Sequence, residues 1–91
     1  MMTHEEILEE IYRLLREHLE VKKSLGPETD LLRDLELDSL KHLTFVVELE
    51  NRFRVRFDSG DEEEIRTLDE VAILVSQRLA EAGAREEARN G

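Results

Sequence analysis

Apolar residues recur every three or four positions near the start of the chain, which is the spacing of one helix face. Thr3 and Glu6 stand three positions apart in front of this stripe, as in a capping box. Gly26 and Pro27 follow it as helix breakers. The pattern predicts a first long helix that begins after Thr3 and ends before Gly26. Its buried stripe comprises Ile7, Leu8, Ile11, Leu14, Leu15 and Leu19.

The next stretch, PETDLLRDLELD at 27–38, has no clear period. It carries four leucines, and we expect all of them to be buried. An ordered loop pinned by these side chains, with one helical turn as an option, fits it best. The leucines are Leu31, Leu32, Leu35 and Leu37.

Helical spacing returns at Ser39, and Asp38 is the natural N-cap of this second long helix. Its apolar residues cover a wider arc than one buried face requires, so some of them should be exposed. They are Leu40, Leu43, Phe45, Val46, Val47, Leu49 and Phe53.

The remaining chain predicts a connector and two more helices. FRVRFD at 53–58 alternates with period two, but no other segment offers it a strand partner, so it should be extended. SGDEEEIR looks like a short acidic helix. Thr67 and Glu70 form a second capping box before the last long helix, and the residues after 82 should fray.

Together these elements predict an all-α fold, a small four-helix bundle with three long helices, one short helix and a long first loop. At 91 residues the chain is one domain, 1–91, with about 3–82 ordered and 83–91 as a frayed tail. A domain of this size has a modest core and no room for a large active-site cleft.

Charge and composition exclude several classes of function. The net charge of -10 repels nucleic acids and anionic membranes, and together with the small size it favours a monomer. With no Cys, the chain can form neither a disulfide nor a thiolate metal site. No apolar run is long enough to span a bilayer. The start, MMTHEE, lacks the features of a signal peptide, so a cytoplasmic location is expected.

Catalytic and metal-binding patterns are also missing from the sequence. His4, His18 and His42 are scattered over different segments and form no recognisable ligand set, so we expect no metal site. Gly60 comes too early for a calcium loop of the EF-hand type. No His stands in a predictable relation to Ser39, and the sequence does not indicate an enzyme.

Ser39 has two interpretations. As part of an isolated DSL tripeptide it would only open a helix, which is common. The order of the segments favours a functional role for Ser39 in addition to capping. This order is PETDLLRDLELDSL, an apolar helix, FRVRFDSGDEEEIRTLDEV and a final helix. In this order the chain resembles the acyl carrier proteins over nearly its whole length, because in that family the second helix begins with D-S-L and a Thr follows the acidic third helix.

The resemblance implies that Ser39 is an attachment point rather than a catalyst. Its hydroxyl would receive 4′-phosphopantetheine from coenzyme A through a separate phosphopantetheinyl transferase. By the same resemblance Asp38 would help that enzyme hold its divalent metal, and Leu40 would help to dock it. The position suits a phosphodiester, because a helix N-terminus offers unpaired N–H groups and the positive end of the dipole.

Further sites follow from the resemblance. The docking surface for partner enzymes would comprise Leu43, Thr44, Val47 and Glu50. An acyl chain would fold back among Val46, Leu49, Phe57, Ile65, Leu68 and Val71, all of which are equally compatible with ordinary core packing.

The sequence departs from the family pattern in three places. Glu36 stands where Gly is usual, and the loop should take a different path because Glu does not readily adopt a positive φ. Phe57 replaces a smaller aliphatic residue and would shorten or redirect the acyl cavity. Residues 39–57 carry a net charge of +2, whereas 58–70 carry -6, so the negative charge lies after the docking helix rather than on it.

The sequence thus predicts a free-standing carrier of acyl thioesters for enzymes of fatty-acid, lipid or polyketide-like biosynthesis. Because of its unusual charge, we expect dedicated acyl-transfer or condensing enzymes as partners, and poor recognition by generic fatty-acid synthase enzymes. An aminoacyl or D-alanyl carrier is a close alternative. A helical adaptor that is not modified, and that binds a partner through residues 39–53, is the rival from another class.

Overall fold

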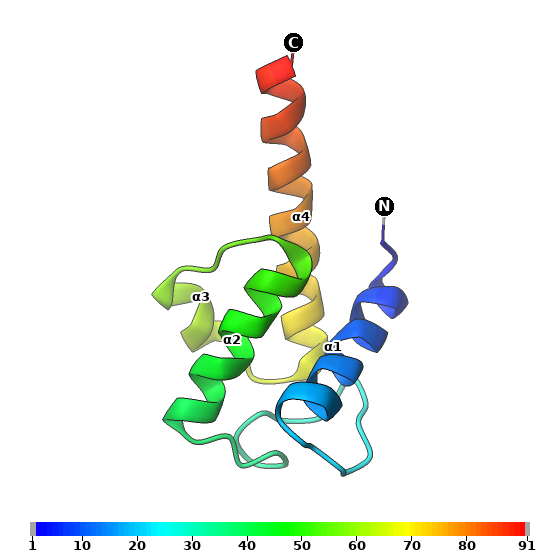
Figure 1. The fold of residues 1–91 in the computed structure, drawn as a ribbon, viewed down its shortest axis with the longest axis vertical. Coiled ribbons are helices and arrows are strands. Elements are labelled where there is room, and N and C mark those ends of the chain that lie inside the picture. The colour runs from blue at the N-terminus through cyan, green and yellow to red at the C-terminus, as the bar shows by residue number, and fades with distance from the viewer. Residues whose placement is uncertain (1, 91) are drawn as a thin grey trace.

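The computed structural model describes residues 2–90, and the side chains of residues 2–83. Its four helices are α1 (His4–His18), α2 (Ser39–Phe53), α3 (Ser59–Glu64) and α4 (Leu68–Asn90). The described residues contain no strand, only one isolated bridge between Asp30 and Thr67. Figure 1 shows α1 and α2 beside α4, with α3 beyond α2. The predicted all-α class, with one short helix and a long first loop, is confirmed.

Local capping signals explain where the long helices begin. Thr3 and Glu6 form the expected capping box, with hydrogen bonds of 3.1 Å and 2.8 Å. Thr67 and Glu70 form the second one at the start of α4. Asp38 Oδ1 accepts a hydrogen bond from the Lys41 N–H at 2.9 Å. All three predicted helix starts are therefore confirmed.

The carboxyl ends of α1 and α2 are set by residues in the left-handed backbone conformation. α1 ends at His18, well before Gly26, because Glu20 turns the chain with φ 54° and the Val21 N–H bonds to the Leu15 carbonyl. α2 ends at Phe53, where Arg54 has φ 57° and its N–H bonds to the Glu50 carbonyl. The following residues run without strand structure to α3, as the sequence predicts for this connector.

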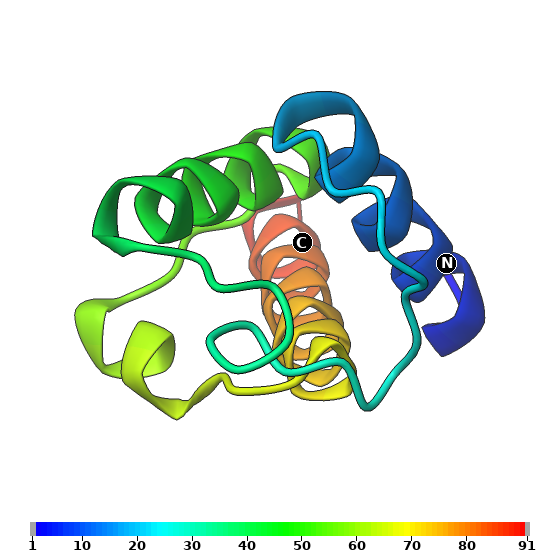
Figure 2. The same cartoon turned by 90° about the horizontal axis from the view of Figure 1, so that it is seen from below.

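The core lies where α1 and α2 pack around α4, which Figure 2 shows nearly end-on between them. It is built from fully buried aliphatic side chains and one aromatic ring, including Ile11, Leu14, Leu15, Phe45, Leu49, Leu68, Val71 and Val75. The first loop adds Leu31 and Leu37 to the core. Leu32 is 74% exposed, so the expectation that all four loop leucines are buried is wrong. Leu32 faces solvent because the turn at 31–35 directs the side chain of its neighbour Leu31 into the core.

Backbone pairing fixes the first loop against the start of α4. The Leu31 N–H donates to the Arg66 carbonyl at 2.9 Å, and the Leu68 N–H donates to the Thr29 carbonyl at 3.1 Å. Asp30, a buried charged residue, closes the adjacent turn: its Oδ1 accepts from the N–H groups of Leu32 and Arg33. These hydrogen bonds, from Arg33 above all, lower the pKa of Asp30.

Replacing Asp30 by Asn should therefore destabilise the fold in a pH-dependent way. A lowered folded-state pKa means that the stabilisation is fully present above the unfolded pKa of about 3.9 and is lost as the pH falls through the lower folded value. We expect Asp30→Asn to lower the Tm by several degrees at pH 7, with the difference from wild type shrinking below about pH 4. Thermal unfolding followed by circular dichroism checks this. Glu28→Gln, an exposed loop substitution, is the control; an Asp30→Asn deficit that does not change with pH would contradict the interpretation.

Glu36 corrects another expectation. Its φ is 51°, so the loop adopts the left-handed conformation that Gly would supply, and Glu accepts the strain. The turn is held by hydrogen bonds from the Glu36 N–H to the Leu32 carbonyl and from the Leu37 N–H to the Leu31 carbonyl. Because Leu37 must be buried two residues before Ser39, the surrounding contacts determine this backbone path.

Substitutions at position 36 should reveal this strain. Glu36→Gly should be more stable than Glu36→Ala by about 1 kcal/mol, because a Cβ is unfavourable at positive φ. At Glu9, an exposed position within α1, the same pair should have the reverse order by about 1 kcal/mol. Chemical denaturation of the four variants measures both differences, and an Ala that is as stable as Gly at position 36 would contradict the assigned conformation.

The backbone of α4 is helical to Asn90, whereas we expected the ordered part to end near residue 82. Residues 80–89 consist largely of Ala, Glu and Arg, which are strong helix formers, and Gly83 alone does not stop the helix. Fraying of the last residues in solution stays a prediction, and residue 91 lies outside the described part. No helix among the described residues is both long and apolar enough to cross a bilayer.

Candidate functional site

Ser39 is the first residue of α2, and its side chain is exposed. Asp38 caps the helix by binding the Lys41 N–H, while the Asp38 carbonyl accepts from the His42 N–H at 2.8 Å. The hydroxyl of Ser39 therefore stands at the positive end of the helix dipole, reachable from solvent. Leu40 follows it and is 73% exposed, an unusual position for a large aliphatic side chain.

The wide apolar arc of α2 divides into two faces. Phe45, Val46 and Leu49 are buried in the bundle, whereas Leu43 and Val47 are 55% and 42% exposed. The prediction that part of this arc is exposed is confirmed. Leu40, Leu43 and Val47 lie three or four positions apart and therefore form one exposed apolar row.

The other two predicted docking residues are engaged within the protein. Thr44 is half-buried, and its hydroxyl donates to the Leu40 carbonyl at 2.9 Å. Glu50 is also half-buried, and its Oε2 accepts from the Phe57 N–H at 2.9 Å, which ties the connector to α2. These two residues border the exposed row and support it.

An open pocket of about 1000 Å³ lies beside Ser39, between the first loop, the start of α2 and the segment from α3 to α4. Its apolar lining comes from Leu31, Leu32, Leu37, Leu43 and Ile65. Its polar lining comes from Asp30, Arg33, Asp38, Ser39, His42, Glu62, Glu63, Glu64, Arg66 and Glu70. Ser39 is thus placed at the mouth of a cavity with both apolar and acidic walls.

The structure brings only Ile65, of the six residues expected to line an acyl cavity, to this pocket. Val46, Leu49, Leu68 and Val71 are at most 3% exposed, and Phe57 packs against the core from outside. Sequence reasoning missed His42 and the loop leucines as lining residues, although the need to bury those leucines beside Ser39 was a usable signal.

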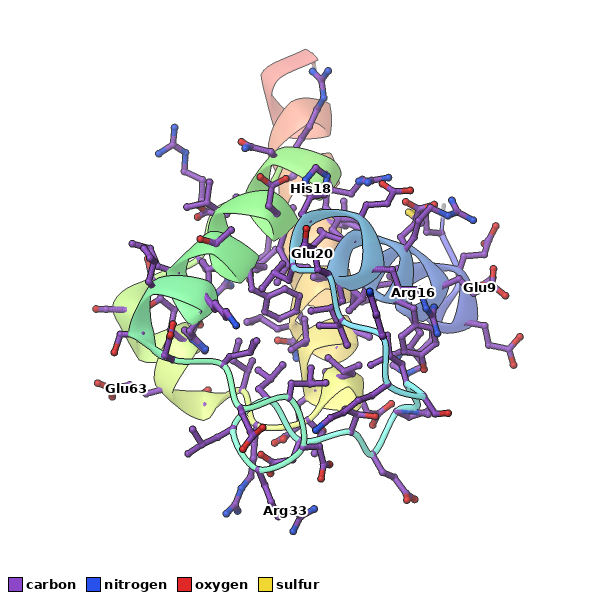
Figure 3. All side chains as sticks on the ribbon, turned by 60° about the horizontal axis from the view of Figure 1, so that its bottom comes forward. Glu9, Arg16, His18, Glu20, Arg33 and Glu63 are labelled. Atoms are coloured by element: carbon purple, nitrogen blue, oxygen red, sulfur yellow. The ribbon has the colours of Figure 1, made fainter. Side chains whose placement is uncertain are left out.

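The far wall of the pocket is held by packing at both ends of α3 and by one ion pair. No residue within α3 is buried, but Phe57 before it and Ile65 after it pack against the core. Arg78 of α4 lies 2.5 Å from Asp61 Oδ2, and this contact lowers the pKa of Asp61. Figure 3 shows Glu63 of α3 and Arg33 of the first loop pointing outward at two sides of this end of the molecule.

A second Asp-Ser pair provides an internal comparison. Ser59 is exposed and is the first residue of α3, after Asp58, just as Ser39 follows Asp38. It precedes Gly60 and a run of acids instead of a leucine, on a helix of only six residues. The two serines share a local motif, but only Ser39 has an apolar row beside it.

No group of three or more His, Asp or Glu side chains within the described part of the chain is arranged to hold a metal ion.

Comparisons with known proteins agree on one family. The family model described as "Phosphopantetheine attachment site" matches residues 9–75. An acyl carrier protein of Thermotoga maritima is 31% identical over 80 residues, covering 87% of this chain and 99% of that one. Another, of Rubrobacter xylanophilus, is 36% identical over 75 residues, covering 81% and 93%. A crystal structure of an acyl carrier protein from Thermotoga maritima shares the fold, with a TM-score of 0.75, 18% identity and coverage of 87% and 93%.

Proposed function

We propose that Ser39 bears a 4′-phosphopantetheine group, because the chain belongs to the acyl carrier proteins. Members of this family are carriers, not enzymes, and they hold that group covalently. The observation that carries the proposal is the exposure of Ser39 at the start of α2, next to the exposed Leu40 and at the mouth of the open pocket.

The residues around Ser39 fit a phosphodiester. The first N–H groups of α2, at Ser39 and Leu40, have no hydrogen-bond partner among the described residues, and the helix dipole favours an anion there. The hydroxyl is reachable by a second protein because the loop-to-helix junction is open. When attached, the group supplies a thiol that holds acyl intermediates as thioesters, which this chain without Cys cannot do itself.

Neighbouring residues have supporting roles in this proposal. Asp38 keeps Ser39 at the helix start through its cap and helps the phosphopantetheinyl transferase to hold its metal. Leu40, Leu43 and Val47 provide the apolar contact for that enzyme and for acyl-handling partners. Thr44 and Glu50 support the row from its border.

The acyl chain has a different path in this proposal from the one the sequence suggested. The open pocket lies directly beside Ser39, and Leu37, Leu43 and Ile65 give it apolar walls. We place the first part of the acyl chain in this pocket. Val46, Leu49, Leu68 and Val71 lie deeper in the core and would contact cargo only if the bundle opened.

The cargo and setting are also proposals. Acyl intermediates of fatty-acid, lipid or polyketide-like biosynthesis agree with the family, and an aminoacyl cargo is the alternative. Dedicated acyl-transfer or condensing enzymes are the expected partners of a cytoplasmic monomer, 1–91, that forms a single domain.

The intact mass of the protein purified from its own source tests the proposed function. A carrier should be isolated at least partly with one phosphopantetheine attached. A folded protein that is never modified would favour the adaptor, for which the exposed row of Leu40, Leu43 and Val47 would then be the binding surface.

A further inference from the structure

The exposed apolar row of α2 continues into polar residues at its carboxyl end. At 100° per residue, Leu40, Leu43, Val47 and Asn51 fall within about 80° of one another around the helix axis, and Arg54 caps the carboxyl end of the helix. All five are exposed. We call them the α2 face. The rise of about 1.5 Å per residue places Arg54 roughly 22 Å from Ser39 along the helix.

Three exposed cations of residues 39–57 have no internal partner. Lys41, Arg54 and Arg56 are exposed, and none of them lies within ion-pair distance of an acid in residues 2–83. Arg52 is different: its guanidinium lies 2.8 Å from Glu10 and 3.4 Å from Glu17 of α1. The structure thus uses Arg52 to join two helices and leaves the other three cations for solvent or a partner.

The two carboxylates of the same segment are directed elsewhere. Glu48 lies 3.7 Å from His18 of α1, and Glu50 accepts the hydrogen bond from the Phe57 N–H. Neither forms an ion pair with Lys41, Arg54 or Arg56 within the described residues. The segment's net charge of +2 therefore appears mainly at the exposed cations.

The opposite charge gathers on the other side of the pocket. Residues 58–70 carry a net charge of -6, and Glu62, Glu63 and Glu64 line the pocket mouth. A partner that places its active-site entrance over Ser39 therefore meets acids on the α3 side, and the exposed Arg54 and Arg56 at and just after the carboxyl end of α2. In a protein of net charge -10, these two exposed cations restrict which surfaces can dock.

We propose that the α2 face docks enzymes whose binding rim is acidic where it meets Arg54, about 20 Å from the entrance to the active site, and Arg56 two residues further along the chain. An apolar hollow in that rim receives Leu40, Leu43 and Val47. This inference rests on the proposed function, and it names the chemistry of the partner rather than its reaction. Nucleic acids and anionic membranes are disfavoured occupants, because the molecule as a whole is strongly negative.

A matched pair of enzymes tests the proposal. One is a fatty-acid ketosynthase whose carrier-docking rim is basic, and the other is the same enzyme with the Lys and Arg residues of that rim replaced by Glu. Wild-type protein, first shown by intact mass to carry phosphopantetheine and then acylated, is offered to both. We expect kcat/KM to be about tenfold higher with the acidic rim at low salt, and the difference to shrink as salt is added.

Charge reversal on the carrier should exchange this preference. Arg54→Glu/Arg56→Glu should favour the basic rim, whereas Arg16→Glu/Lys22→Glu, which changes the net charge equally but lies away from α2, should behave as wild type. Circular dichroism confirms that each variant is folded. Equal use of both rims, or a preference of the wild type for the basic rim, would overturn the proposal. Absence of phosphopantetheine would instead refute the proposed function, so the two failures are distinct.

Discussion

Ser39→Ala should lose all capacity to receive phosphopantetheine while keeping its fold. The side chain is exposed, and none of the hydrogen bonds of the described residues involves its hydroxyl, so removing the oxygen should change the free energy of unfolding by no more than about 0.5 kcal/mol. Transfer requires that oxygen, so labelling with a fluorescent coenzyme A analogue and a transferase should fall to background.

Ser59→Ala is the matched control for this experiment. It removes the hydroxyl from the other Asp-Ser pair at a helix start, and we expect labelling to equal that of wild type. Residual labelling of Ser39→Ala that disappears in the double variant would place the attachment at Ser59 and contradict the assignment.

Phe45→Ala should have the largest effect on stability. Phe45 is completely buried in the core that α2 forms with α1 and α4. Deleting a buried aromatic ring typically costs about 3–5 kcal/mol, which is a large part of the roughly 5–15 kcal/mol that stabilises a domain. We expect the variant to be largely unfolded at 37 °C and to lose labelling, because the start of α2 is no longer formed.

Phe57→Ala is the control for Phe45→Ala, because it removes the same aromatic ring from a position outside the core. Phe57 is half-buried and packs against the outside of the core, so its removal should cost about 1–2 kcal/mol and leave labelling intact. Urea denaturation followed by circular dichroism measures both variants. A Phe45→Ala protein as stable as Phe57→Ala would show that α2 does not depend on its buried face.

The helices were predictable because their signals are local, whereas the proposal for Ser39 rests on the order of all the parts along the chain. Thr3 with Glu6, Asp38 with Lys41, and Thr67 with Glu70 each act within four residues, and the apolar period shows which face is buried. The apolar arc of α2 is wider than one buried face needs, and this width alone indicates that some of its apolar residues are exposed.

The remaining features depend on contacts between distant segments. The first loop is fixed by pairing of residues 27–31 with 66–69, and this pairing decides that Leu31 is buried while Leu32 is not. The same constraint holds Glu36 at positive φ against its own preference. The pocket forms where this loop meets α2 and α3, so its lining could not be derived from the period of any one helix.

The central claim is that Ser39 carries the phosphopantetheine, and mass spectrometry tests it most directly. The protein is incubated with coenzyme A, Mg²⁺ and a permissive phosphopantetheinyl transferase, and its intact mass and peptide masses are then measured. We expect a gain of one phosphopantetheine, located on the peptide that contains Ser39. A folded protein that several transferases leave unmodified, or a group located at Ser59, would contradict the account.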